Sequence, residues 1–174
     1  MTEFINEPID TTALPRFEEV QLTPIHPGYW KIVLINFSIA YLIVGGIFGA
    51  ALWFIEELHP FTILIITAYV LIVVLNLWIS RISFRNKGYA FRTHDAIYRS
   101  GAIAITTTII PYNRVQHVAL HEGWLSRKLG LAAVEIFTAG GDSSDVKVVG
   151  IEKEQAERIK QLLMGKILMQ DANE

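Results

Sequence analysis

The fold is decided by two long uncharged runs that lie close together in the sequence. The first, residues 32–55, reads IVLINFSIAYLIVGGIFGAALWFI, and the second, residues 60–80, reads PFTILIITAYVLIVVLNLWIS. About 20 apolar residues in a helix, at a rise of about 1.5 Å each, cross the hydrocarbon core of a bilayer. The short segment Glu56-Glu57-Leu58-His59 joins the two runs. The sequence therefore predicts a two-helix transmembrane hairpin.

The hairpin divides the chain into three parts. Residues 1–31 form a polar N-terminal arm, residues 32–80 the hairpin, and residues 81–174 a basic juxtamembrane stretch followed by a second domain. The last part is long enough to enclose one modest core. Cysteine is absent, which excludes disulfides, thiolate metal sites and cysteine nucleophiles. Before residue 20 the arm is mostly acidic, and its charged residues are Glu3, Glu7, Asp10, Arg16, Glu18 and Glu19.

The positive charges near the runs predict an orientation. Lys31 precedes the first run, Arg81, Arg85 and Lys87 follow the second, and residues 56–59 contain neither Lys nor Arg. Because Lys and Arg near span ends favour the cytoplasmic side, we expect both termini to be cytoplasmic. The first run is longer than the apolar region of a signal peptide and has an acidic flank, so we expect it to remain as an anchor.

Small and amide residues inside the runs suggest packing contacts. Asn36 and Asn76 lie at matching distances from the cytoplasmic ends of the two runs. A hydrogen bond between these amides would clamp the hairpin and contribute about 0.6 to 2 kcal/mol. We favour this clamp over a transport site because neither run contains Asp, Glu, Lys, Arg or His. Gly45 and Gly49 form a GxxxG motif, which predicts a packing face within the hairpin or between protomers.

The second domain has mainly the pattern of β-strands. Alternating apolar residues and runs of Ile and Thr predict strands, and a turn at 140–142 is expected between the last two. Residues 152–164 place Ala156, Ile159 and Leu163 on one face of an amphipathic helix. We therefore expect an α+β domain, a small antiparallel β-barrel capped by a C-terminal helix. The strand segments are 89–93, 96–100, 103–110, 114–121, 131–139 and 146–149.

Two motifs in this domain resemble a known family. Residues 109–118, IIPYNRVQHV, and residues 124–131, WLSRKLGL, are similar in order and spacing to the bacterial pleckstrin-homology-like membrane proteins, the YdbS-like group with a bPH2 domain. The resemblance implies a pleckstrin-homology-like fold after a two-span hairpin, in the bacterial inner membrane. It implies a binding or scaffolding fold, and no catalytic residues. Eukaryotic pleckstrin-homology domains that bind phosphoinositides carry Lys and Arg in the loop between their first two strands, whereas residues 93–96, THDA, contain no such cluster.

The residues that could support catalysis or metal binding do not form a recognisable set. His117 and His121 are spaced as a metal pair, but no third ligand is evident in the sequence. No GxSxG or other nucleophile motif surrounds a serine. We expect no enzymatic activity, no metal or other cofactor, and no nucleic-acid partner.

The basic stretch after the second run has two interpretations. Arg81, Arg85 and Lys87 are explained by topology alone, which is the interpretation we favour. They would also attract anionic lipid by about 1 kcal/mol per charge. This cluster is the candidate lipid-facing site.

A second candidate surface comes from the motifs of the domain. Trp124 with Arg127 and Lys128 combines an aromatic with cations, a composition enriched at protein interfaces, although Trp124 would equally serve to cap the core. Arg114 and Gln116 would share one face of a strand, as a hydrogen-bonding network or as part of a partner surface.

Two functions from different classes follow. The leading hypothesis is a membrane-anchored cytoplasmic interaction or scaffolding module that assembles with itself or with a related membrane protein. The alternative is a module that responds to anionic lipid at the inner-membrane surface, with the bilayer as its partner.

Overall fold

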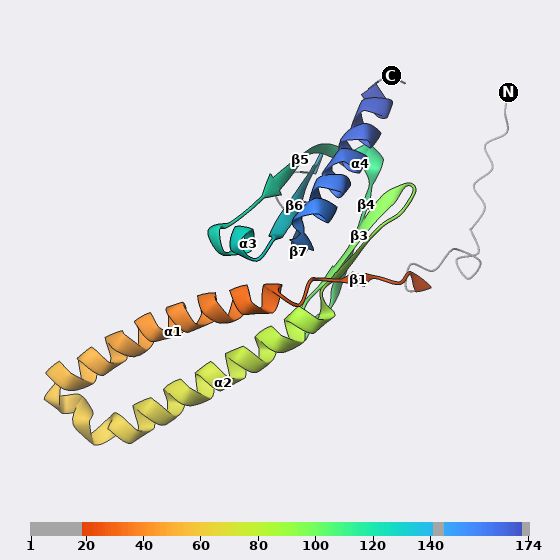
Figure 1. Cartoon of the computed structure of the whole chain (residues 1–174). Coiled ribbons are helices and arrows are strands. Elements are labelled where there is room, and N and C mark those ends of the chain that lie inside the picture. The colour runs from red at the N-terminus through yellow and green to blue at the C-terminus, as the bar shows by residue number, and fades with distance from the viewer. Residues whose placement is uncertain (1–18, 141–144, 172–174) are drawn as a thin grey trace, which may run out of the picture.

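The computed structural model describes residues 19–140 and 145–171. It contains a long helical hairpin and a domain of strands and helices at the open end of that hairpin (Figure 1). Most of the acidic arm, residues 1–18, and most of the turn expected at 140–142 lie outside the described residues.

Two helices form the hairpin, α1 (Tyr29–Phe54) and α2 (Thr62–Asn86), joined by the short 3-10 helix η3 (Glu56–Phe61). Both helices are long and apolar enough to cross a bilayer, and most of their large apolar side chains are exposed. In water this surface would be costly, whereas lipid solvates it. Helix α2 continues past the predicted end at Ser80 because nothing in the sequence breaks it before Gly88.

Tyrosine rather than asparagine joins the two helices. The Tyr69 hydroxyl donates a hydrogen bond to the Tyr41 carbonyl, and a Cβ added at Gly45 would lie 2.8 Å from that hydroxyl. The Asn76 amide donates to the Ile72 carbonyl of its own helix, and Asn36 is exposed on α1. The predicted Asn36–Asn76 clamp is therefore wrong. Asn36 lies five residues before Tyr41 and therefore on a different face of α1. Asn76 lies on nearly the same face of α2 as Tyr69, but its side chain bonds to its own helix.

Gly49 of the GxxxG motif has no neighbour within 4 Å of an added Cβ, and neither does Gly46. Of the three glycines, Gly45 alone packs within the described hairpin. The motif therefore does not form one packing face between α1 and α2.

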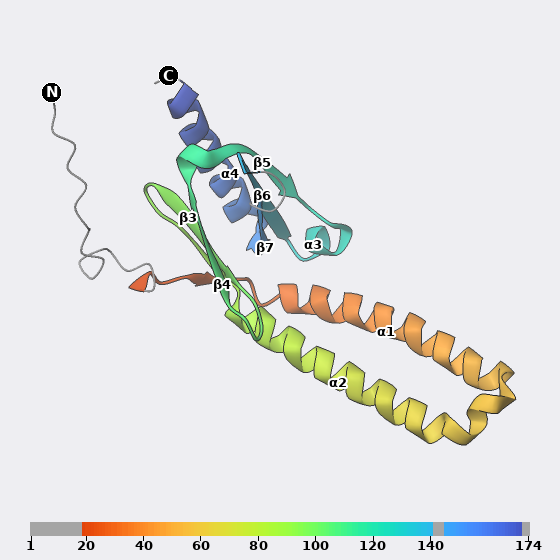
Figure 2. The ribbon, with the colours of Figure 1, turned by 180° about the vertical axis from the view of Figure 1, so that it is seen from behind.

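The domain contains two antiparallel sheets in the described part of the chain. The strands of one sheet are, in spatial order, β1 (Thr23–Pro24), β2 (Gly88–Phe91), β3 (Asp95–Ser100) and β4 (Thr106–Pro111), and those of the other are β5 (Val115–His121), β6 (Leu131–Thr138) and β7 (Val146–Glu152). The two sheets do not close into the expected barrel. Helix α4 (Lys153–Asp171) packs on the second sheet, and Ala156 and Leu163 of α4 are buried in the core, as their spacing predicts (Figure 2). Two short helices complete the domain, η4 (Tyr112–Arg114) between β4 and β5 and α3 (Trp124–Lys128) between β5 and β6.

The segment just before the first span belongs to the domain. Strand β1 pairs with β2, the strand that follows the second span. Ile25 is only 3% exposed and belongs to the core, and the His26 backbone N–H donates to the Gly150 carbonyl at 2.7 Å. Residues 23–28 are therefore part of the folded domain, not of a separate arm. The chain enters and leaves the hairpin at the same end.

Candidate interaction site at the hairpin junction

The three cations of the basic stretch do not act as one surface. The Arg81 guanidinium lies 4.8 Å from the centre of the Trp30 ring, where the ring face attracts a cation. Arg85 is exposed one turn further along α2. Lys87 is half-buried, and this burial lowers the pKa of its ammonium group. Arg81 and Arg85 therefore share an exposed face of α2 that Lys87 does not join.

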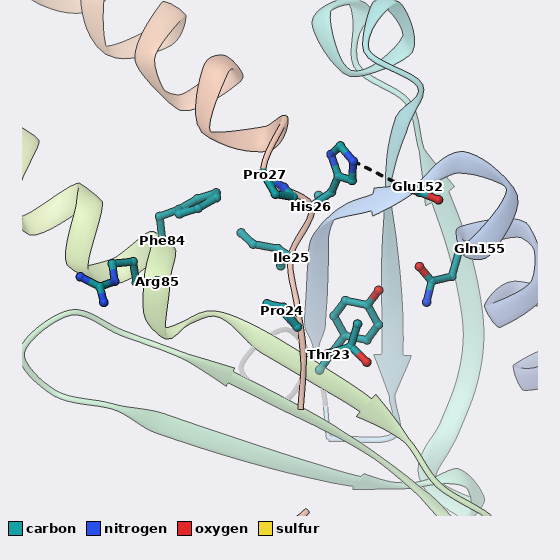
Figure 3. A pocket seen from close by; sticks show the side chains of 11 residues that line it. Thr23, Pro24, Ile25, His26, Pro27, Phe84, Arg85, Glu152 and Gln155 are labelled. Atoms are coloured by element: carbon teal, nitrogen blue, oxygen red, sulfur yellow. Dashed lines mark ion pairs between the residues drawn. The ribbon is translucent and has the colours of Figure 1, made fainter. Parts of the chain in front are cut away.

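Arg85 lines a hollow of about 480 Å³ between the end of α2, the segment around Ile25 and the start of α4 (Figure 3). Across this hollow His26 Nε2 lies 3.5 Å from a Glu152 carboxylate oxygen. Burial is the main cause that raises the pKa of the Tyr89 hydroxyl, which also lines the hollow. Its lining combines apolar side chains with the Arg85 cation and the His26–Glu152 pair, from segments that meet where the hairpin joins the domain.

A larger hollow, of about 620 Å³, lies where α1 meets α3. Ile32 and Asn36 of α1 line it together with Trp124 of α3 and Lys147 of β7. Trp124 is 65% exposed, and the Lys128 ammonium lies 4.2 Å from the centre of its ring. Of the two interpretations of Trp124, the structure supports the exposed one. This hollow and the exposed face of Trp124 are called the α1–α3 surface below.

Charged side chains continue this surface across the outer face of the second sheet. Glu135 lies between His121, at 2.6 Å, and Lys147, at 3.1 Å. The hydrogen bond from Lys147 is the main cause that holds the pKa of Glu135 below its usual value. His117 shares this face with His121, but its ring stacks on Phe137 at 4.1 Å. The described residues contain no cluster of His, Cys, Asp or Glu that could hold a metal.

The five residues of the predicted partner surface do not lie together. Arg114 belongs to the 3-10 helix η4 rather than to a strand, and β5 has an irregularity between Val115 and His117, so Arg114 and Gln116 do not share a strand face. Arg114 and Gln116 lie at the start of β5, and α3 follows the other end of this strand, about 20 Å away. Trp124, Arg127 and Lys128 do lie together on α3.

Sequence reasoning missed the contribution of Tyr29, Ile32 and Lys147 to the α1–α3 surface. No pattern in the sequence signals it, because these residues come from segments that are far apart in the chain and meet through the fold.

The hairpin and the domain together match a known protein family. The family model described as "Bacterial PH domain" matches residues 32–167, which include the hairpin and nearly all of the domain. This chain belongs to the bacterial PH domain family. No solved structure matches it significantly.

A transmembrane protein of Bacillus subtilis (strain 168) is also similar to this chain. The transmembrane protein YdbS is 36% identical over 72 residues, which are 41% of this chain and 43% of the relative. The match therefore spans less than half of the relative's length. Together with the two apolar helices, it supports a location in a membrane. Neither description names an enzymatic activity.

Proposed function

We propose that the chain is a membrane-anchored interaction module that assembles with another membrane-spanning chain, a second copy or a related protein, through the α1–α3 surface. The observation that carries this proposal is that residues of the first span and of the domain line one hollow. A partner with both a transmembrane helix and a juxtamembrane segment would contact both parts at once.

Asn36 supports a helical partner within the membrane. Its amide is exposed on α1, and among the described residues it makes no hydrogen bond. An amide in an apolar span is costly when it lacks a partner, and hydrogen bonds between helices relieve this cost. Trp124 supports a protein partner above the membrane, because exposed tryptophan is enriched at the centres of protein interfaces.

The domain and both termini are proposed to be cytoplasmic, in the inner membrane of a bacterium. Lys31, Arg81 and Arg85 lie at one end of the hairpin, and η3 at the other end contains no Lys or Arg. The excess of cations favours the cytoplasm for the domain end.

Photo-crosslinking in native membranes tests the interaction. A photoreactive amino acid at position 124 of the full chain should give a discrete crosslinked product, and so should one at position 36. The same amino acid in place of Glu157, exposed on the outer side of α4, is the matched control and should give none. The product's mass then separates a second copy from a different protein. Absence of product at both 124 and 36, or equal yield at 157, contradicts the proposal.

Response to anionic lipid is the second candidate, favoured by the exposed face of Arg81 and Arg85. The full chain should be used, because a fragment 88–174 lacks Ile25 of the core. In nanodiscs, anionic lipid should raise the thermal midpoint of the parent chain more than that of Arg81→Gln/Arg85→Gln. Arg158→Gln, an exposed arginine on α4, should behave as the parent. Equal shifts in all three proteins would contradict a specific role of Arg81 and Arg85.

A further inference from the structure

The loop that joins β3 to β4, residues 101–105, is an exposed apolar segment of the domain. It reads GAIAI and contains no charged or polar side chain. Ile103 is 89% exposed, and Ile105 is also exposed. An apolar tip of this kind in water is unfavourable, and contiguous exposed apolar surface usually marks a contact with a partner or a membrane.

Strand pairing directs this loop toward the membrane. Strand β2 begins at Gly88, directly after α2, and β3 runs antiparallel to it, with Arg99 opposite Gly88. Residues after Ser100 therefore extend past the start of β2 and back along α2. Figures 1 and 2 both show this end of the β3–β4 hairpin beside the end of α2.

Side-chain contacts hold the loop in that position. The Asn86 amide donates a hydrogen bond to the Gly101 carbonyl at 3.1 Å. Ala102 lines a hollow of about 290 Å³ together with Ile79, Ser80 and Ser83 of α2. Gly101 has φ of +124°, and a Cβ there would lie 1.9 Å from the Ala104 carbonyl oxygen, so the tight turn requires glycine. The loop therefore has a defined conformation against the helix.

The depth of these contacts corresponds to the surface of the bilayer. The hydrocarbon core takes about 20 helical residues, so a span that begins at Thr62 leaves it near Arg81. Ala102 lines the hollow at this level, and Ile103 follows it in the exposed part of the loop. The exposed cations Arg81 and Arg85 lie at the same level, where they suit lipid headgroups.

We propose that residues 101–105 insert into the bilayer as a third membrane contact, with Ile103 and Ile105 among the acyl chains next to α2. Insertion would bury apolar side chains that the protein leaves exposed. It would also prevent the domain from tilting about the ends of the hairpin, so that the α1–α3 surface keeps one height above the membrane. The proposal requires only that the hairpin spans the bilayer, and it is independent of the proposed protein partner.

Depth-dependent quenching tests the insertion. Because the chain has no cysteine, Ile103→Cys in the full chain can be labelled at one position with an environment-sensitive fluorophore and placed in phosphatidylcholine nanodiscs. Spin-labelled acyl chains should quench this label several-fold more strongly than they quench a label at Leu168→Cys. Leu168 is 67% exposed on α4 and is the matched control. Aqueous iodide should give the opposite order.

A label at Ile105→Cys provides an independent second position on the loop, and it should also be quenched by the acyl-chain probe. If the labels at 103 and 105 respond to iodide as the label at 168 does, the loop lies in water and the proposal is wrong. If neither quencher reaches them, protein covers the loop, and the proposal is equally wrong. None of these results depends on crosslinking at position 124 or 36.

Discussion

Trp124 and Glu135 show how the environment decides the role of a single residue. Trp124 has the size of a core residue but remains exposed with Lys128 over its ring. Glu135 is on a strand otherwise rich in buried residues, and its carboxylate pairs with residues from both neighbouring strands. Cross-strand pairs of opposite charge stabilise a sheet modestly.

The pairing of Glu135 predicts a dependence of stability on pH. The pKa of Glu135 in the folded protein is below the usual value of 4.5. As the pH falls, the carboxylate is therefore protonated in the unfolded chain before it is protonated in the folded protein. The stabilisation is complete above the unfolded pKa and is lost as the pH falls through the lower folded pKa. Glu135→Gln should therefore lower stability near pH 7 by about 0.5 kcal/mol, and this difference should shrink below about pH 4.

Thermal unfolding in detergent, followed by near-ultraviolet circular dichroism, measures this effect. Glu157→Gln, an exposed residue on α4, is the control and should differ little from the parent at either pH. A Glu135→Gln deficit that stays constant from pH 7 to about pH 3 would show that the ion pair is not its cause.

At the scale of elements, the hairpin depends on a contact between α1 and α2 near the middle of the spans. Tyr69→Phe removes the hydroxyl that donates to the Tyr41 carbonyl and keeps the ring. We expect a loss of about 0.5 to 2 kcal/mol, seen as a lower thermal midpoint in detergent. Asn76→Ala should cost less, because Asn76 bonds within its own helix. A larger loss of stability for Asn76→Ala than for Tyr69→Phe would contradict this assignment and favour a contact through Asn76.

The segment around β1 connects the hairpin to the domain and should be essential to the core. Ile25→Ala removes most of a buried side chain and should destabilise the domain by about 2 to 4 kcal/mol. Thr23→Ala, an exposed position in β1, should have an effect below about 0.5 kcal/mol. Limited proteolysis of the two variants in detergent compares them. Equal protection of both would mean that the segment before α1 is dispensable.

At the scale of the whole molecule, both connections to the hairpin lie at the same end of it, so the proposed orientation places both on the cytoplasmic side. A membrane-impermeant thiol reagent applied to intact cells should label Glu57→Cys in η3 and leave Glu157→Cys in α4 unlabelled until the membrane is opened. Both side chains are exposed, so accessibility from each side is what differs. Labelling of Glu157→Cys in intact cells would reverse the proposed orientation.

The spans, the strand-rich domain and the helix that carries Ala156 and Leu163 could all be predicted from the sequence. Each leaves a periodic pattern within one segment, and hydrophobic periodicity is a local property. The family resemblance is also local, in residues 109–131, and the match to the bacterial PH domain family confirms it.

Contacts between distant segments were decided by the tertiary structure alone. Ile25 joins a core formed after the hairpin, Tyr69 rather than Asn76 meets α1, and Asn36 faces the hollow beside α3. The reason is geometric. Spacing in a sequence predicts which residues share a face of one element, but the partner of that face depends on how separate elements pack.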